Sequence, residues 1–311
     1  METVLVTGGA GYIGSVLVAE LLSNGYKVIV VDNFRYKQTS LNALCYHKNF
    51  EVIKGDVCLQ SVMLPALKKA DYIFPLAALV GAPLCEQDPL TATAVNKAAV
   101  LMMLKYLSPH QRVVMPTTNS AYGSGDENND CDEQSSLKPI SQYAIEKVEV
   151  EKALLEHPNT ISYRLATVFG LSPRMRLDLL VNDFTYRAVH DGFLVLFEGH
   201  FKRNYIHVRD VSNAFLHAMA YFDLMKGGIF NIGLSNANLS KRELCAKIKD
   251  HLPAFHYLEA HCGKDPDQRN YIVSNQKIEN TGYKPQYSVD DGIVELIKGY
   301  VMLQNSLYAN V

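Results

Sequence analysis

The sequence has no excess of positive charge. Its 30 lysines and arginines stand against 32 aspartates and glutamates, which gives a net charge of −2 at pH 7. Proteins that bind mainly nucleic acid or anionic membranes usually carry a basic surplus, because phosphate charges must be neutralised. We therefore expect neither nucleic acid nor a membrane as the main partner.

A long hydrophobic run is also lacking. The longest apolar stretch, Tyr72 to Cys85, is too short to span a bilayer and contains Pro75, Gly81 and Pro83. The first expected strand begins at Val4, which leaves no room for a signal peptide. These features predict a cytoplasmic protein.

Paired cysteines are absent as well. The six cysteines are scattered without any C-x-x-C spacing, which indicates reduced thiols and argues against a zinc site. The ten histidines are equally dispersed, and His251 and His256 are too far apart in register to share a helix face as ligands. We expect no metal.

What the sequence does contain is a glycine triplet between an apolar strand, 4–6, and an apolar helix, 15–22. In such a loop Gly8 allows a tight turn, Gly11 lets the backbone approach a pyrophosphate, and Gly14 lets helix and strand pack closely. The N-terminus of the helix then offers its N–H groups and dipole to the pyrophosphate. The expected cofactor-binding residues of this loop are Gly8, Gly11, Tyr12, Ile13 and Gly14.

A carboxylate at the expected distance supports a dinucleotide site. The apolar run 27–31 ends in Asp32, where a carboxylate can accept hydrogen bonds from the adenosine ribose, with Asn33 beside it. Asp32 would repel a 2′-phosphate and so favours NAD over NADP, although Arg35 lies close by. A glycine turn that binds no ligand is the less favoured alternative.

Later strands end in loops suited to the same cofactor. Asp56 and Val57 follow a third strand and could touch the adenine, and the small residues Ala77 and Ala78 follow Leu76 at the end of a fourth. Ligands of parallel sheets bind outside the carboxyl ends of the strands, where all these loops lie.

The alternation of apolar strands with helices predicts an α/β fold: a Rossmann doubly wound parallel sheet with a smaller α/β C-terminal substrate domain. We expect an NAD-binding domain over 1–170, with 207–225 packing back on it, and a mainly substrate-binding domain over 171–311. The helix expected over 91–107 is apolar on more than one stripe, which favours a homodimer. Burial within one chain is the alternative.

Tyr143 and Lys147 are four residues apart on one expected helix and so share a face. An ammonium group beside a phenol favours the phenolate, and Tyr143 can then remove a proton from a substrate hydroxyl while hydride passes to NAD. Thr118, at the end of a fifth strand, can orient the reacting oxygen. A buried tyrosine and a surface lysine without catalytic roles are the alternative reading.

With these motifs the chain resembles, over essentially its whole length, the extended short-chain dehydrogenases/reductases of the NAD-dependent epimerase/dehydratase family. The resemblance implies a sugar-nucleotide substrate held between the two halves of the chain. The substrate-binding residues it implies are Asn119, Ser120, Arg174, Asn182, Arg203 and Arg269. Arginine suits such a site because its planar fork binds phosphate bidentately.

One departure from the family pattern narrows the reaction. The family's 4,6-dehydratases place Asp-Glu directly after the catalytic threonine, whereas this chain has Asn119 and Ser120. An amide and a hydroxyl are poor acids and bases near neutral pH, so dehydration is disfavoured. The expected chemistry is oxidation at C4 of the sugar, which ends in a dehydrogenase if the keto sugar leaves and in a 4-epimerase if it is reduced on its other face.

Longer blocks resemble bacterial capsule-pathway dehydrogenases that oxidise C4 of GDP-manno-heptose. The blocks are 79–85, 118–120, 164–183 and 197–211. Such an enzyme would need its NADH reoxidised, for which 2-ketoglutarate is a candidate. The alternatives are a UDP- or GDP-hexose 4-epimerase, a non-catalytic NAD-binding regulator, and an NADP-linked keto-sugar reductase.

Overall fold

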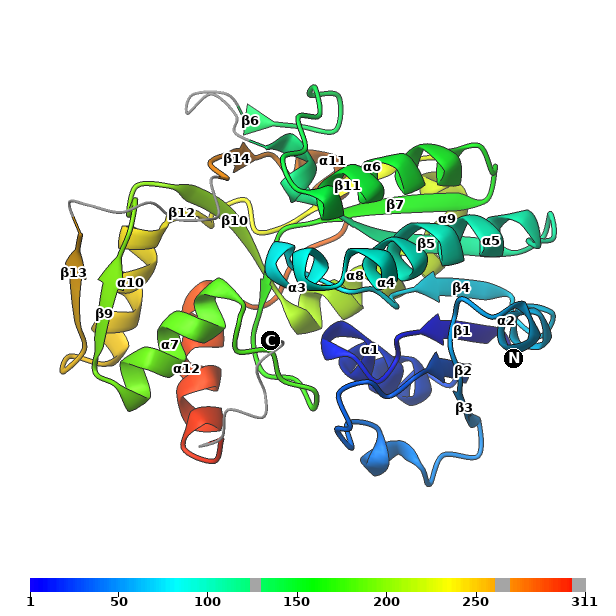
Figure 1. Cartoon of the computed structure of the whole chain (residues 1–311), viewed down its shortest axis with the longest axis horizontal. Helices are drawn as coiled ribbons and strands as arrows, with labels where there is room; N and C mark the ends of the chain where they lie inside the picture. The colour runs from blue at the N-terminus through cyan, green and yellow to red at the C-terminus, as the bar shows by residue number, and fades with distance from the viewer. Residues whose placement is uncertain (124–129, 261–268, 304–311) are drawn as a thin grey trace.

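The structure, a computed structural model, describes residues 1–123, 130–260 and 269–303. Its centre is a seven-stranded parallel sheet with helices on both faces (Figure 1). From one edge to the other, the strands are β11 (Ile229–Ile232), β7 (Thr160–Leu165), β5 (Arg112–Thr118), β4 (Tyr72–Pro75), β1 (Thr3–Thr7), β2 (Lys27–Asp32) and β3 (Phe50–Lys54). The chain runs from β1 outward to β3 and then returns to β4 on the other side of β1, so a ligand-binding switch point lies at the end of β1. The predicted fold class is confirmed.

Each central strand sends alternate side chains to the two faces of the sheet. Val4 and Val6 of β1 face one apolar core and Leu5 faces the other. The first core is covered by α1 (Tyr12–Ser23) and α8 (Val208–Ala220). The second is covered by α2 (Gln60–Leu67), α5 (Ala99–Lys105) and α6 (Gln142–Leu155). Burial on both faces explains why the strands are apolar without interruption.

Short helices and turns complete this half of the chain. They are η1 (Asn42–Leu44), α3 (Ala82–Gln87), α4 (Pro89–Thr93), η2 (Ala94–Ala98) and η3 (Asn119–Tyr122). The helix expected over 91–107 is therefore built from α4, η2 and α5, and η2 is a π-helical turn. A π-helical turn often marks a functional position, because it shifts the side chains that follow.

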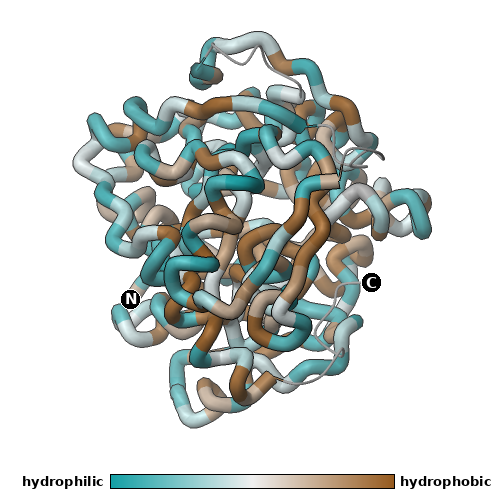
Figure 2. Tube along the Cα trace, turned by 90° about the vertical axis from the view of Figure 1, so that its left-hand side faces the viewer, coloured by the Kyte–Doolittle hydropathy of each residue, from teal (hydrophilic) through white to brown (hydrophobic). Residues whose placement is uncertain are grey.

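The remaining elements form smaller sheets and helices. The three-stranded sheet consists of β12 (Asn238–Ser240), β10 (Lys202–His207) and β8 (Thr167–Phe169). Two parallel pairs are β9 (Phe193–Leu196) with β13 (His256–Glu259), and β6 (Asp130–Cys131) with β14 (Ile272–Val273). The helices are α7 (Leu180–His190), α9 (Phe222–Met225), α10 (Lys241–His251), α11 (Gln276–Glu279) and α12 (Val289–Tyr300). Among these elements, α7, α10, α12, β9 and β13 lie together at one end of the molecule (Figure 1). Seen from the side of α10 and β9, apolar stretches run through the middle of the molecule and hydrophilic ones lie mostly at its rim (Figure 2).

Two segments that follow residue 171 belong to the main sheet layer. Helix α8 packs against α1, within the range 207–225 that we expected to return to the first half. Strand β11 adds to the sheet beside β7, with Phe230 opposite Tyr163. One continuous core joins α1 and α8 with α7, α10 and α12. The division at residue 170 stays a prediction.

Within the described ranges, no helix is both long and apolar enough to cross a membrane. The five cysteines of these ranges are free thiols: Cys45, Cys58, Cys85, Cys131 and Cys245. The same part of the chain holds no cluster of three or more histidine, cysteine or acidic side chains arranged for a metal ion.

Candidate active site

The glycine loop closes tightly between β1 and α1. Gly8 has φ +68°, and a Cβ atom there would lie 2.6 Å from the backbone N of Ala77. A Cβ on Gly14 would lie 2.4 Å from the Gly8 carbonyl oxygen. Gly11 is the N-cap of α1, and no side chain caps this helix. The first turn, with Tyr12 and Ile13, therefore presents its N–H groups to the loop, as an anion site requires.

Asp32 lies at the end of β2, next to this loop. Its carboxylate accepts hydrogen bonds from the backbone N of Ala10 at 3.0 Å and of Phe34 at 2.8 Å. Burial raises the pKa of Asp32, while these two bonds and the charge of Arg174 act in the opposite direction. Each carboxylate oxygen keeps a further lone pair for a ribose hydroxyl. The side-chain Oδ1 of Asn33 accepts a hydrogen bond from Arg35 N at 3.0 Å.

The loops after β3 and β4 complete this edge of the sheet. The Asp56 carboxylate accepts a hydrogen bond from Cys58 N at 2.9 Å, which fixes the turn that contains Val57. The backbone N of Leu76 bonds to Thr7 O at 3.1 Å. Ala77 and Ala78 follow. Gly8 lies so close to the backbone of Ala77 that no residue with a side chain fits at position 8. The predicted cofactor residues thus lie along one edge.

Strand β5 ends in the polar turn η3. Thr118 Oγ1 accepts a bond from Ser120 N at 3.1 Å and lies 3.0 Å from Ser120 Oγ, which also contacts the Arg269 guanidinium. Asn119 between them is 1% exposed, and neither polar atom of its amide has a partner in the described part of the chain. An unpaired buried amide costs free energy, which a substrate hydroxyl could recover after a small rotation.

Tyr143 and Lys147 lie on one face of α6, as predicted from their spacing. The Lys147 ammonium is 5.9 Å from the centre of the Tyr143 ring. Lys147 is 3% exposed and makes no hydrogen bond or ion pair with another described residue. Burial lowers its pKa to about 8, and nearby Cys85 and Glu146 oppose that change. Such a lysine is available to hold ribose hydroxyls.

Arginines approach Tyr143 from two other parts of the chain. Burial raises the pKa of the Tyr143 phenol to about 12, whereas the charges of Arg176 and Arg269 lower it. Arg176 is held by Asp178 through Nε at 3.2 Å and Nη2 at 2.6 Å. Arg269 was expected at the substrate; Arg176 was not, and nothing in its spacing distinguishes it from Arg174.

These features fit a bound NAD. The glycine positions form a cradle that Cβ atoms would fill, the first turn of α1 is uncapped, Asp32 offers acceptors, and Lys147 offers an unpartnered ammonium. A family model for the NAD dependent epimerase/dehydratase family matches residues 4–233. The chain belongs to this family. NAD is its cofactor, and it is an enzyme of the sugar-nucleotide epimerase/dehydratase group.

Relatives in this family cover nearly the whole chain. A CDP-paratose 2-epimerase from Salmonella typhi is 25% identical over 94% of this chain and 97% of that protein. A dTDP-glucose 4,6-dehydratase from Streptomyces niveus is 27% identical over 96% of this chain and 92% of its own length. These relatives bear the names of different reactions, so they do not select one reaction for this chain.

Solved structures of the family share the fold. A UDP-glucose 4-epimerase from Thermotoga maritima, with UDP-glucose, has a TM-score of 0.84 at 26% identity over 96% of this chain and 99% of that one. A dTDP-glucose 4,6-dehydratase from Bacillus anthracis, in complex with NAD, has a TM-score of 0.82 at 23% identity over 97% of each chain. The second likeness concerns the fold alone.

The other residues expected at the substrate make contacts with residues other than Tyr143. Arg174 stacks on Tyr36, 3.8 Å from the ring centre. Asn182 in α7 uses both ends of its amide inside the protein, toward Gly170, Tyr12 and Arg176. Arg203 in β10 is 3% exposed and donates to Lys202 O at 3.0 Å. Their substrate contacts stay predictions.

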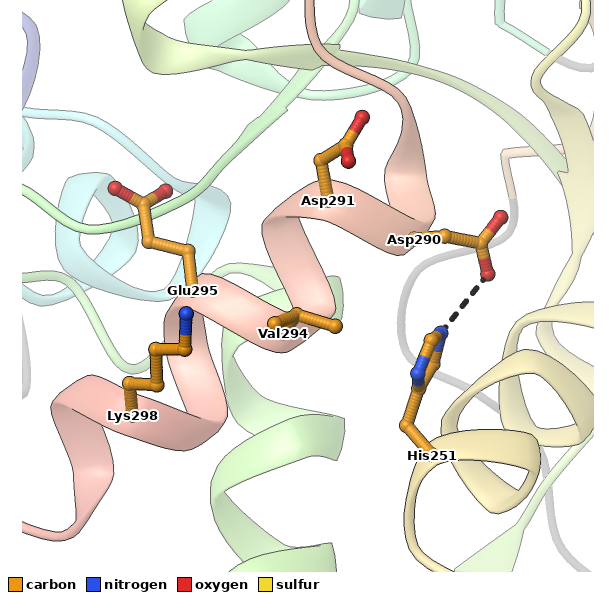
Figure 3. Close-up of a pocket in the computed structure, with 6 residues that line it drawn as sticks. All are labelled: His251, Asp290, Asp291, Val294, Glu295 and Lys298. Carbon is orange, nitrogen blue, oxygen red and sulfur yellow. Dashed lines mark hydrogen bonds and ion pairs between the residues drawn. The ribbon is translucent and has the colours of Figure 1, made fainter.

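A surface hollow of about 370 Å³ lies between α10 and α12, and none of the expected substrate-binding residues lines it (Figure 3). Its acidic side chains already have partners. Asp290 bonds to Lys247 and His251, the Asp291 carboxylate accepts a hydrogen bond from the backbone N of Ser288, the N-cap of α12, and Glu295 pairs with His207. We assign it no ligand.

Asn96 is a further residue of the site that sequence reasoning missed. It lies in the π-helical turn η2, is fully buried and bonds to both backbone polar groups of Leu79, in the loop after β4. The available signal was an amide inside an otherwise apolar helix pattern, which requires a buried partner.

Proposed function

We propose that the protein oxidises the C4 hydroxyl of a nucleotide-linked sugar with NAD, and that Tyr143 is the base. The observation that carries the proposal is the position of Tyr143 beside Lys147 on one face of α6, next to the turn that follows Thr118. Lys147 is buried there and makes no hydrogen bond or ion pair with another described residue. A non-catalytic NAD-binding regulator would have no need of a base such as Tyr143.

In this mechanism Thr118 and Tyr143 hold the reacting hydroxyl, and Tyr143 Oη takes its proton. Bound NAD would accept the hydride from the same carbon. The guanidinium groups of Arg176 and Arg269 lower the pKa of Tyr143 and so favour the phenolate that must accept the proton, and the ammonium of Lys147 lies 5.9 Å from the centre of the ring. Lys147 would also hold the nicotinamide ribose hydroxyls and so fix the distance over which hydride moves.

Dehydration is disfavoured because the turn after Thr118 carries no carboxylate. Ser120 is already engaged by Thr118 and Arg269, and Asn119 can donate and accept hydrogen bonds but cannot serve as an acid near neutral pH. We therefore propose that the reaction ends with a 4-keto sugar. The proposed substrate is GDP-manno-heptose in bacterial surface-polysaccharide synthesis, with 2-ketoglutarate as the hydride acceptor that restores NAD.

A 4-epimerase acting on a UDP- or GDP-hexose is the second candidate. The likeness to the Thermotoga maritima UDP-glucose 4-epimerase favours it, since both share the fold over nearly their full lengths. Besides the sugar, the two candidates differ in whether the keto intermediate leaves or is reduced on its other face. The homodimer, the cytoplasmic location and the two-domain division are also part of the proposal.

Mass spectrometry of the products decides between these candidates. The purified protein is incubated with GDP-manno-heptose and 2-ketoglutarate, with Tyr143→Phe as the matched control. A product lighter by two hydrogens, formed only by the parent and accompanied by loss of the keto acid, supports the dehydrogenase. An unchanged mass with an inverted C4 centre by NMR indicates an epimerase. An untouched sugar rules out this substrate, and turnover by Tyr143→Phe within a few-fold of the parent rules out the proposed base.

A further inference from the structure

The segment 171–176, which follows β8, is bonded to the first turn of α1. Ser172 Oγ donates to the backbone O of Tyr12 at 2.7 Å and lies 3.0 Å from Ser15 Oγ. The Tyr12 hydroxyl in turn donates to Gly170 O at 2.6 Å. The segment therefore lies against the end of α1 that faces the cofactor phosphates.

Arg174 extends from this segment to the loop after β2. Its guanidinium carbon is 3.8 Å from the centre of the Tyr36 ring, and the residue is 2% exposed. The charge of Arg174 lowers the pKa of Asp32, so the guanidinium acts on the carboxylate that is expected to serve the adenosine ribose. Nη1 also donates to Met175 O at 3.0 Å. Arg174 thus lies at the adenosine end of the cradle.

The loop that carries Tyr36 is itself fixed to the cofactor cradle. Ser40 Oγ donates to Ala10 O at 2.8 Å, and Phe34 N donates to the Asp32 carboxylate. Arg174 comes from the segment after β8 and Tyr36 from the loop after β2. The two side chains therefore meet beside Asp32 and the glycine loop. A planar guanidinium suits both phosphate oxygens and the face of a ring.

We propose that the segment 171–176 is a strap over the adenosine half of bound NAD, with Arg174 as the residue that holds this half. The geometry favours this role over a contact with the sugar nucleotide, because Asp32 ends β2 and Tyr36 lies in the loop that follows it. The arginines that act on Tyr143 are instead Arg176 and Arg269. The inference depends on NAD binding alone and does not depend on which sugar is oxidised.

Equilibrium binding of cofactor fragments tests the strap without any sugar substrate. We would measure the dissociation constants of NADH, ADP and reduced nicotinamide mononucleotide for the parent, Arg174→Ala and Arg174→Lys. Arg187→Ala is the matched control, since Arg187 is an exposed arginine of α7 in a surface ion pair. We expect Arg174→Ala to weaken ADP and NADH about tenfold and to leave the mononucleotide unchanged. Arg174→Lys should be intermediate, because it keeps the charge and loses the planar stack.

A second pair of variants covers the case in which Arg174→Ala does not fold. Tyr36→Phe keeps the ring under the guanidinium and should bind ADP like the parent, whereas Tyr36→Ala should bind it more weakly. The proposal is wrong if folded Arg174→Ala binds ADP within twofold of the parent, or if it loses the mononucleotide rather than ADP. Equal ADP affinities of the two Tyr36 variants would also overturn it.

Discussion

Asn96 holds the backbone of Leu79 through both ends of its amide. Its Oδ1 accepts a hydrogen bond from Leu79 N at 2.9 Å, and its Nδ2 donates to Leu79 O at 3.0 Å. The side chain thereby completes the hydrogen bonding of a loop residue as a neighbouring strand would. Cys85 Sγ also approaches the Leu79 carbonyl, at 3.3 Å. The loop after β4 is thus fixed beside Tyr143 by the π-helical turn.

Asn96→Ala should destabilise the protein and weaken NADH binding. It leaves the N–H of Leu79 without its partner and the C=O with only the weak thiol donor of Cys85, which costs about 1–3 kcal/mol of unfolding free energy. Urea unfolding and NADH titration check both effects. Asn24→Ala is the control, because Asn24 is an exposed residue at the end of α1 whose side chain donates to Glu20 O at 2.8 Å. A loss of stability no larger than that of the control would contradict the role given to Asn96.

Glu151 and Arg164 form a buried ion pair beneath the active-site turn, and breaking it should be costly. Arg164 Nη2 lies 2.6 Å from Glu151 Oε1, and both side chains are 4% exposed. The same carboxylate accepts bonds from Ser162 and Thr117. Glu151→Gln leaves a buried cation uncompensated, so we expect a loss of about 3–5 kcal/mol in unfolding free energy.

The exposed pair of Lys69 and Glu51 provides the comparison, since its atoms are 2.8 Å apart but its side chains are 49% and 36% exposed. Glu51→Gln should cost about 0–1 kcal/mol. Denaturant unfolding of both variants measures the difference. Similar losses in the two variants would mean that burial does not determine the contribution of these pairs.

The charges around Tyr143 predict opposite pH shifts for two neighbouring variants. The groups that interact with the phenol are Arg176, Cys85 and Arg269, with the Lys147 ammonium beside the ring. Arg176 lowers the pKa of Tyr143, and Asp178 partly neutralises Arg176. The phenolate form accepts the proton, so activity rises as pH increases toward the pKa of Tyr143.

Arg176→Gln should therefore move this rise to higher pH and lower kcat/KM near pH 7 about three- to tenfold. Asp178→Asn should move it to lower pH, because the guanidinium then acts unopposed. The pH profile of kcat/KM is compared with tyrosinate absorbance, using Tyr143→Phe to identify the signal. Shifts in the same direction for both variants would show that these residues act through folding and not through charge.

The sequence was most informative where one residue type has one physical use. Local geometry was enough to predict the glycine loop at the start of α1, the carboxylate of Asp32 at the end of β2, and the shared helix face of Tyr143 and Lys147. The apolar strands were enough to predict the fold class. The contacts of Arg174 and Arg176 could not be predicted, because two arginines that are two residues apart come to contact different parts of the site, Tyr36 and Asp178, only after the loop that follows β8 has folded. The hydrogen bonds of Asn96 depend likewise on a π-helical turn that no local pattern specifies.

Two glycines near α1 provide a final test, because they separate crowding from backbone conformation. A Cβ on Gly14 would lie 2.4 Å from Gly8 O and 2.7 Å from Gly9 Cα, so Gly14→Ala must displace the glycine loop. Gly25 has φ +82° and open space around it, so Gly25→Ala strains only the turn before β2. We expect Gly14→Ala to weaken NADH binding at least about tenfold, and Gly25→Ala to cost about 1–2 kcal/mol of unfolding free energy with unchanged NADH affinity. Fluorescence titration with NADH and urea unfolding measure both quantities. Parent-like NADH affinity in Gly14→Ala would show that the loop tolerates displacement and that its close packing is not what holds the pyrophosphate.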